Sequence, residues 1–373
     1  MYKFDISYVT TDSISEGVGS SQILPLVSKL SGSGLKVNLI SYEKTSPSEE
    51  TRSELLESGV LWTPLEFRTK SGLGGLSRMF ELRKVIQASD IIHARSDIPA
   101  MSGILSGNGP VLWDVRSLWA DQRMFSTESS IEKQILKTAK LIERFNCGKS
   151  VGMSTLTNQV VPVFAKRYRK LPEFRIVVPT AVDLERFKLV PIMPKQVRAL
   201  YSGTFNRYYD LKLSKEFTDY LSSLTAIEIG WARPKEAEGS VLGVGESNIF
   251  ALTQNQMANI LGDYSFGMSV CRNDAGVSLK AAMPTKIAEF LASGRPVVVN
   301  KGLGDFDDFL AEFTAGVILD GTRKNLIEGA EQLLALISDP ETPIRCRALA
   351  EKYFGLNKGV GKYLDLYKMM SSL

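Results

Sequence analysis

The chain has 373 residues, of which 44% are hydrophobic and 23% charged, and its formal net charge is +4. This length exceeds a single core and fits two domains, while the composition excludes broad disorder. No apolar run reaches eighteen residues, so no membrane-spanning helix is expected. The small net charge, without a recognisable motif, gives no indication of nucleic-acid binding.

The N-terminus and the cysteines indicate the compartment. The opening MYKFDISYVTTD carries acidic residues where a signal peptide needs an unbroken apolar stretch. Cys147, Cys271 and Cys346 are too far apart for a disulfide framework or a zinc motif. With a single histidine, His93, no metal site is expected either. These features predict a cytoplasmic protein.

In the first half of the chain, short β-rich runs alternate with segments of helical period. The amphipathic stretches 20–30 and 76–87 lie between some of these runs. Repeated strand–helix–strand order predicts a parallel sheet with right-handed crossovers. The expected strands are 4–10, 36–42, 60–67, 90–95, 110–115, 150–155 and 175–180.

A basic amphipathic helix is expected over 131–150. Its cationic residues recur at helical spacing and interleave with apolar ones, and further basic residues crowd KRYRK at 166–170. Such a helix either rests on an anionic membrane surface or presents a solvated face of a core helix. The cationic residues of the helix are Lys133, Lys137, Lys140, Arg144 and Lys149.

The pattern pauses at 189–196, LVPIMPKQ, where two prolines flank a segment without periodicity that suits a linker. A second α/β series follows, so the chain divides into domains at 1–188 and 189–352. The last segment, 353–373, is predicted to be a helix that crosses back to the first domain, after a break near Gly355 to Gly361. The strands of the second series are 197–203, 225–232, 265–271, 295–300 and 315–320, separated by helices at 255–261, 284–294 and 325–339.

The strongest local signal is MPTKIAEFLASGRPVVVN. Pro284 suits the first position of a helix that runs to residue 293. The free N–H groups around Thr285 and Lys286, with the helix dipole, can hold a phosphate or diphosphate. Glu289 lies one turn further along the same face and can accept hydrogen bonds from ribose hydroxyls. An ordinary helix–strand connection with a proline cap is the alternative interpretation.

This segment resembles the donor-binding motif of bacterial retaining GT-B glycosyltransferases of family four, in the version found in polysaccharide assembly. Many members carry two glutamates there with seven residues between them. Glu289 matches the second, which contacts the ribose, whereas Ala281 replaces the first, which usually contacts the donor sugar. The resemblance implies an α/β fold of GT-B type, in which two Rossmann-like domains with parallel sheets face an interdomain cleft. The donor would bind mainly to the second domain and the acceptor to the first.

Two glycine loops resemble the same family. EGVGSSQILPLVSKL resembles its first loop and helix, where Gly17 and Gly19 would let the backbone approach the diphosphate, although a flexible turn is an equal alternative. YSGTFNRYYDL, with Gly203, resembles the loop that opens the second domain. Thr204 and Tyr209 stand there in place of the usual arginine and lysine.

Two arginines could replace those missing cations. Arg207 and Arg272 each bring a fixed charge able to meet phosphate oxygens, although either could equally have a surface or structural role.

Two segments of the first domain complete the resemblance. WDVRSLWADQR resembles a segment that faces the cleft in polysaccharide-associated members, which makes Asp114, Arg116 and Asp121 candidates for contacts to acceptor or donor sugar. DIIHARS resembles a strand-end motif, with Arg95 where a second histidine is frequent. His93 follows an apolar run in that strand, and a structural role is expected for it.

The resemblance implies a hexosyltransferase-type glycosyltransferase that moves a sugar from a UDP- or GDP-linked donor to a glycan or lipid-linked acceptor. The resemblance also implies that this enzyme needs no cofactor or metal and retains the anomeric configuration of the transferred sugar. Lys286, Arg207 and Arg116 are the expected catalytic groups, stabilising charge as the diphosphate leaves. A nucleotide-sugar epimerase of similar fold and a non-catalytic sugar-nucleotide- or polysaccharide-binding subunit are the alternatives. A cytoplasmic location is expected, with contact to the inner face of an anionic membrane through the basic helix.

Overall fold

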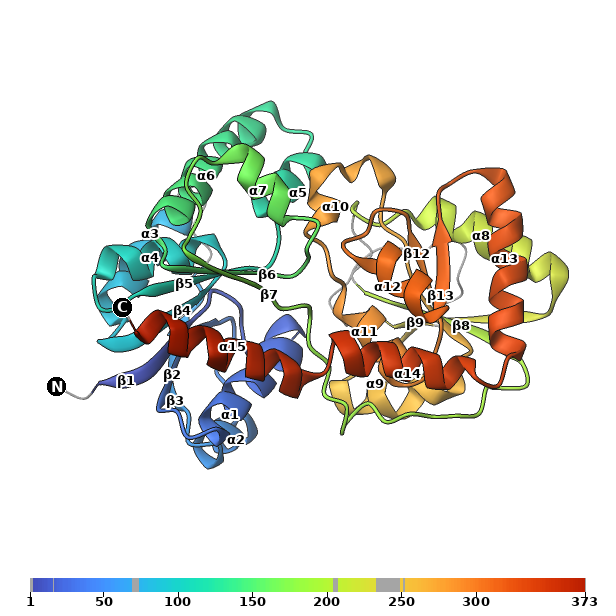
Figure 1. The fold of residues 1–373 in the computed structure, drawn as a ribbon, viewed down its shortest axis with the longest axis horizontal. Helices are drawn as coiled ribbons and strands as arrows, with labels where there is room; N and C mark the ends of the chain where they lie inside the picture. Colours follow the sequence, from blue (N-terminus) through green and yellow to red (C-terminus); the bar gives the residue numbers. More distant parts are fainter. Residues whose placement is uncertain are drawn as a thin grey trace. The chain divides into compact units, whose positions relative to one another are not determined.

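The computed structural model describes residues 3–15, 17–68, 74–203, 207–232, 249–250 and 252–372. The chain folds into two compact units. The first consists of residues 1–179 together with the C-terminal segment 356–373, and the second consists of residues 180–355. Each unit has its own parallel sheet with helices on both faces (Figure 1).

All seven strands predicted for the first half of the chain are present in the first unit. They are β1 (Phe4–Val9), β2 (Val37–Glu43), β3 (Leu61–Glu66), β4 (Ser89–Arg95), β5 (Val111–Val115), β6 (Gly152–Thr155) and β7 (Phe174–Val177). The helices are the π-helical turn η1 (Gly19–Ile23), α1 (Leu24–Gly32), α2 (Glu49–Glu57), α3 (Gly74–Val85), α4 (Asp97–Ser106), α5 (Trp119–Ser126), α6 (Ser130–Lys149), α7 (Val161–Arg167) and α15 (Leu356–Ser371).

The sheet of the first unit has the order β3-β2-β1-β4-β5-β6-β7, and all its strands are parallel. Its central strands β1, β2, β4 and β5 are buried almost throughout, because helices cover both faces. Helices α3, α4 and α6 pack together on one face, whereas α1 and α15 lie on the other (Figure 1). This is the doubly wound arrangement that the alternating pattern predicts.

The second unit repeats this topology. Its strands are β8 (Val197–Ser202), β9 (Ile227–Ala232), β10 (Ile249–Phe250), β11 (Phe266–Ser269), β12 (Val297–Asn300) and β13 (Gly316–Leu319). Its helices are α8 (Leu211–Leu224), α9 (Gln254–Ile260), α10 (Val277–Lys280), α11 (Thr285–Ala292), α12 (Phe306–Phe313), α13 (Arg323–Ser338) and α14 (Thr342–Tyr353), with 3₁₀ turns η3 (Leu261–Asp263) and η4 (Asn273–Ala275).

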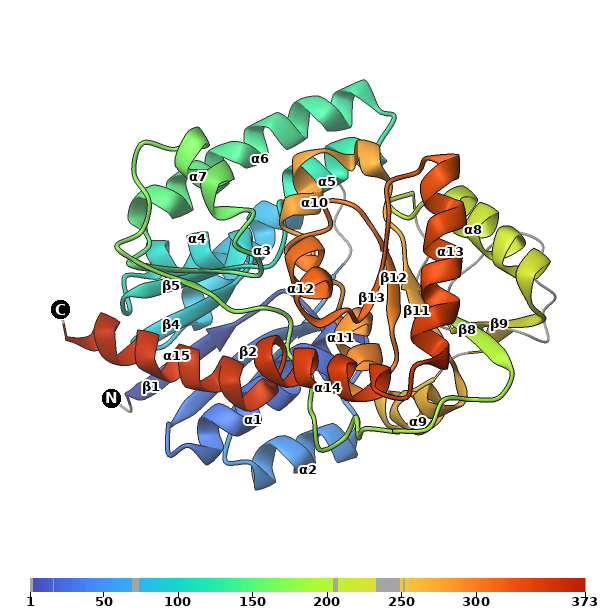
Figure 2. The ribbon, with the colours of Figure 1, turned by 45° about the vertical axis from the view of Figure 1, so that its right-hand side comes forward.

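The second sheet has the order β10-β9-β8-β11-β12-β13, again parallel. Five of its strands match the predicted ones, and the two-residue strand β10 was not predicted. Helices α8 and α13 pack together against one face, whereas α11 contacts β11, β12 and α14 (Figure 2). Phe217, Phe266 and Leu333 are fully buried in the core between the sheet and the α8–α13 pair.

Two arginines, Arg295 fully buried and Arg347 partly buried, attach the segment that enters the second unit. Arg295 donates to the carbonyl oxygens of Val190 and Ile192 at 3.0 and 2.9 Å, and Arg347 donates to that of Phe187 at 2.8 Å. These bonds satisfy carbonyl groups of a segment that has no strand partner. These contacts lie within the second unit, which consists of residues 180–355.

The terminal helix α15 belongs to the first unit. The break from α14 lies at Phe354 and Gly355, and α15 then continues through Gly359 and Gly361, which the sequence had placed in the break. Among the described residues, no helix combines the length and apolar content that crossing a membrane requires.

Candidate active site

In each unit, the strand order reverses beside the first strand. The reversal lies between β1 and β4 in the first unit and between β8 and β11 in the second. Ligands of doubly wound sheets bind outside the carboxyl ends of the strands at such a point. The predicted residues Arg95 and Gly203 lie there, at the ends of β4 and β8.

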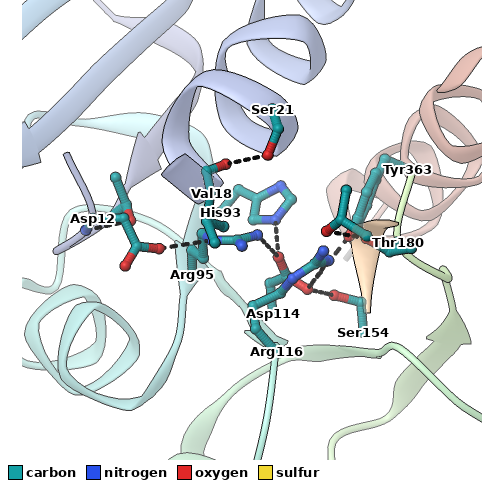
Figure 3. Close-up of polar contacts among 12 residues, drawn as sticks. Asp12, Val18, Ser21, His93, Arg95, Asp114, Arg116, Ser154, Thr180 and Tyr363 are labelled. Carbon is teal, nitrogen blue, oxygen red and sulfur yellow. Dashed lines mark hydrogen bonds and ion pairs between the residues drawn. The ribbon is translucent and has the colours of Figure 1, made fainter. Parts of the chain in front are cut away.

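Asp114 is the centre of a charged cluster in the first unit (Figure 3). Its Oδ2 lies 3.8 Å from Nη1 of Arg95, and its Oδ1 accepts a hydrogen bond at 3.5 Å from Nη1 of Arg116. Ser154 at the end of β6 donates to Oδ1 at 2.8 Å. Arg95 also donates through Nε to Asp12, which follows β1, at 3.0 Å. Three of the predicted first-domain residues, Arg95, Asp114 and Arg116, are thus brought together.

The electrostatics of the cluster keep Asp114 ionised. Burial acts to raise its pKa, but Arg116, His93 and Arg95 outweigh burial and hold the pKa well below its usual range. A carboxylate of this kind is a poor general base at neutral pH. Asp114 therefore suits fixed electrostatic anchoring of the two arginines.

The backbone beside the cluster is strained. Ser96, directly after Arg95, has a φ of 78°, in the left-handed region that non-glycine residues seldom occupy. Such strain concentrates at functional sites.

Asp121, the fourth predicted residue of the first domain, lies outside this cluster. It is in α5, where it accepts two hydrogen bonds at 2.9 Å from Arg167 of α7 and one at 2.9 Å from Lys140 of α6. Arg167 also pairs with the buried Glu143 at 3.2 Å. These contacts tie three helices together, so Asp121 has a structural environment.

The glycine loop after β1 is tightly constrained. Gly17 has a φ of 54°, and a Cβ atom at Gly19 would lie 1.8 Å from the carbonyl oxygen of Ser13. Both positions therefore require glycine. Gly19 opens the π-helical turn η1, a form that is frequent at functional sites.

Glu43, which the sequence analysis missed, holds this loop. Its buried carboxylate accepts hydrogen bonds from the hydroxyls of Ser13, Ser15 and Ser41 at 2.6, 3.0 and 2.6 Å, and from the amide of Ile14 at 3.0 Å. The sequence feature that could have identified Glu43 is an acidic residue at the carboxyl end of an apolar strand, in NLISYE.

We expect Glu43→Gln to lower the free energy of unfolding by about 1–3 kcal/mol, because an amide cannot accept all four hydrogen bonds. Urea unfolding checks the loss, and hydrogen exchange at the Ile14 amide should accelerate. Glu66→Gln is the matched control, since Glu66 ends the neighbouring strand β3 and is 70% exposed. Equal effects of the two substitutions would contradict this role.

In the second unit, the start of α11 lies beside the glycine loop. A Cβ atom at Gly203, whose φ is 147°, would lie 3.3 Å from Nζ of Lys286 and 3.7 Å from the hydroxyl of Tyr209. Pro284, which was predicted to be the first residue of the helix, is the N-cap residue, and α11 begins at Thr285. The Thr285 hydroxyl lies 3.1 Å from that of Thr180. The backbone can approach a ligand closely here, next to a half-buried ammonium group.

Glu289 faces inward from the second turn of α11 and is 4% exposed. Burial raises its pKa to about 7, against the opposing effects of Lys286, a hydrogen bond from Gln254 and the charge of Arg186. Burial likewise lowers the pKa of Lys286, which Glu289 partly offsets. The half-buried Lys286 and the buried Glu289 therefore each favour the charged form of the other.

The predicted arginines lie on adjacent segments. An isolated bridge pairs Tyr209 with Cys271, and the amide of Arg272 donates to the carbonyl oxygen of Tyr208 at 2.9 Å. Both arginines are exposed, and Arg272 forms two hydrogen bonds, at 3.0 and 2.7 Å, with Asp274. Thr204, the remaining predicted residue, lies outside the described residues.

No family model and no curated protein matches this chain. Its structure, however, is similar to that of a sucrose-phosphate synthase from Thermosynechococcus elongatus, with a TM-score of 0.71 and 12% identity over 98% of this chain and 99% of that one. HepE from Anabaena in complex with UDP-glucose matches over the whole of both chains, with a TM-score of 0.67 and 11% identity. The chain has the GT-B glycosyltransferase fold.

A third structure with this fold is a single-residue mutant of TarM from S. aureus, in complex with fondaparinux, α-GlcNAc-glycerol and UDP. The match covers 98% of this chain and 100% of the TarM chain, with a TM-score of 0.69 and 12% identity. Within the described part of the chain, no three His, Cys, Asp or Glu side chains are grouped so as to hold a metal ion.

Proposed function

We propose that this protein is a hexosyltransferase-type glycosyltransferase that transfers a sugar from a UDP- or GDP-linked donor to a glycan or lipid-linked acceptor, with retention. The observation that carries the proposal is the start of α11. There the ammonium group of Lys286 lies next to Gly203, on the side where another residue would have its side chain, and Glu289 is buried one turn further on. The complexes of HepE with UDP-glucose and of TarM with UDP support a nucleotide-linked donor.

Each element at this site has a defined role in the proposed reaction. The helix N-terminus and Lys286 meet the diphosphate and stabilise the charge that develops as it leaves. Arg207 and Arg272 add positive charge from the adjacent segments, and Glu289 accepts hydrogen bonds from the ribose. These residues supply charge stabilisation without a bound metal ion.

The first unit would hold the acceptor. Arg95 and Arg116 present fixed donors around Asp114, a combination that recognises hydroxyl and anionic groups of a glycan. The space beside Gly17 is open to close backbone contact with a ligand, whereas Gly19 lets the loop after β1 pack against Ser13.

A thermal-shift screen against UDP, GDP, ADP, dTDP and CMP, with and without magnesium, tests the proposal. A ligand that binds only the folded state raises the melting temperature according to its affinity and concentration. We expect stabilisation by one nucleoside diphosphate, independent of magnesium, followed by turnover of the corresponding nucleotide sugar. Absence of a shift at millimolar concentration would contradict the donor site, and binding without turnover would indicate a non-catalytic binding subunit. Isomerisation of the free nucleotide sugar would indicate an epimerase.

We also propose that α6 contacts an anionic membrane surface. Ile131, Ile135 and Leu141 are 74%, 54% and 62% exposed, and they lie beside the exposed cations Lys133, Lys137 and Arg144 on the solvent side of the helix. An apolar stripe next to a basic one is the pattern of a helix that lies in a membrane interface.

We expect replacement of Lys133, Lys137 and Arg144 by glutamine to weaken co-sedimentation with phosphatidylserine vesicles by roughly a hundredfold, at about 1 kcal/mol per charge. Glutamine replacements of Lys212, Lys215 and Lys324, which form surface pairs within helices of the second unit, are the control. Binding to neutral vesicles alone, or equal loss in both variants, would contradict the proposal.

A further inference from the structure

His93 lies in an aromatic enclosure built partly by the C-terminal helix. It is completely buried on β4, with the rings of Tyr8 and Tyr363 centred 4.5 and 4.8 Å from its own. The hydroxyl of Tyr367 lies 2.6 Å from Nδ1. Both Tyr363 and Tyr367 belong to α15, about 270 residues further along the chain than His93.

The other ring nitrogen of His93 faces the charged cluster. Nε2 lies 3.5 Å from Oδ2 of Asp114, and the hydroxyl of Tyr363 donates to Oδ1 of the same carboxylate at 3.4 Å. The C-terminal helix therefore reaches Asp114 by two routes: directly through Tyr363 (Figure 3), and through His93 from Tyr367.

The chemistry of these groups selects one tautomer. An ionised carboxylate can only accept hydrogen bonds, so the nitrogen facing Asp114 carries the proton. Nδ1 is then the bare nitrogen and accepts a hydrogen bond from the phenol of Tyr367. Burial lowers the pKa of His93 despite the nearby Asp114 carboxylate, so the ring remains neutral at physiological pH. The charged groups that face it are Asp114, Arg95 and Arg116.

We propose that Tyr367 and Tyr363 are positioning residues, which hold His93 as the Nε2–H tautomer and fix the Asp114 carboxylate between Arg95 and Arg116. The C-terminal helix thereby sets the geometry of the first-unit site. The effect on transfer rests on the proposed function, whereas the arrangement of the imidazole does not.

Because His93 is the only histidine in the chain, ¹⁵N-histidine labelling gives one pair of ring-nitrogen signals that needs no assignment among residues. We expect a protonated Nε2 and a bare, hydrogen-bonded Nδ1, both unchanged between pH 6 and 8. In Tyr367→Phe the Nδ1 signal should move to that of a nitrogen without a hydrogen bond. Tyr353→Phe removes a phenol hydroxyl that donates to Glu312 in the second unit, and should leave both signals in place.

Kinetics separate positioning from simple packing. We expect Tyr367→Phe to lower kcat/KM for sugar transfer roughly ten- to a hundredfold, because small misplacements at a reacting centre have effects of this size. The thermal shift with the nucleoside diphosphate should remain, since the second unit is unchanged. Tyr363→Phe should lower kcat/KM as well without moving the Nδ1 signal, which provides a second variant if Tyr367→Phe folds poorly.

The proposal is overturned if wild-type His93 is protonated at Nδ1, or if Tyr367→Phe leaves the ring signals and transfer kinetics unchanged. A chain that turns over no donor yet shows the expected histidine signals would contradict the proposed function and support the arrangement described here.

Discussion

Replacing Glu289 by alanine is expected to weaken nucleoside-diphosphate binding roughly ten- to a hundredfold and to remove most of the thermal shift. A hydrogen bond to a charged group contributes about 1.5–3 kcal/mol, and the proposed ribose contacts depend on this carboxylate. Isothermal titration with the diphosphate identified in the screen measures the loss. Glu331→Ala, which removes an exposed glutamate from α13, is the matched control.

The same residue predicts a pH dependence. Because burial raises the folded-state pKa of Glu289 to about 7 from an ordinary value of 4.5, the folded protein binds more protons than the unfolded chain between these values. Its contribution to stability therefore falls as pH rises from about 4.5 to 7. Nucleotide affinity should instead increase as pH passes 7, since the ionised carboxylate accepts hydrogen bonds from ribose hydroxyls better.

Glu289→Gln separates these effects from simple loss of packing. The amide has nearly the same shape but does not titrate, so both pH dependences should flatten. A folded Glu289→Ala variant that binds the diphosphate with wild-type affinity would exclude the ribose role of Glu289.

The second large effect is expected for Asp114→Ala, at about 3–5 kcal/mol of unfolding free energy. Removing this carboxylate leaves the charges of Arg95 and Arg116 without their buried partner, which is more destabilising than losing an exposed pair. Urea unfolding, with hydrogen exchange in β4 and β5, measures the loss. Asp90→Ala, which breaks an exposed pair between β4 and Lys3, the residue before β1, should stay within about 1 kcal/mol.

The free energy of unfolding at acid pH provides a second test of Asp114. The folded-state pKa of Asp114 is depressed, so its stabilising contribution is present above the ordinary pKa of an aspartate and is lost as pH falls below it. Wild-type protein should therefore lose more stability than Asp114→Asn when pH falls from 5 towards 2. Parallel pH profiles would show that Asp114 is not the anchor of the cluster.

The sequence was sufficient to predict both parallel sheets, because strands buried on two faces read as apolar runs between amphipathic helices. It also placed Arg95, Asp114 and Arg116 as candidates, and the structure brings them together since β4 and β5 are neighbours. It missed β10, since two residues carry no period that could be detected.

Other parts of the site depend on contacts that no local pattern contains. Glu43 reaches Ser13 and Ser15 from a neighbouring strand, and Tyr367 meets His93 across 274 positions of sequence. Asp121 followed a local motif, yet its carboxylate pairs with Arg167 because α5 packs beside α6 and α7. Periodicity places a residue on an element, and tertiary packing decides which groups that residue meets.

The division of the chain into units has a consequence for biosynthesis. The second unit is continuous from residue 180 to 355, whereas the first requires α15 to cover its sheet. At a translation rate of about 5–20 residues per second, residues 180–355 take roughly 9–35 seconds to synthesise, and the face of the first sheet that α15 covers stays exposed during that time. The second unit can complete its core in that interval. Chaperone binding to stalled nascent chains should accordingly be greatest just before α15 leaves the ribosome, and should fall once that helix has docked.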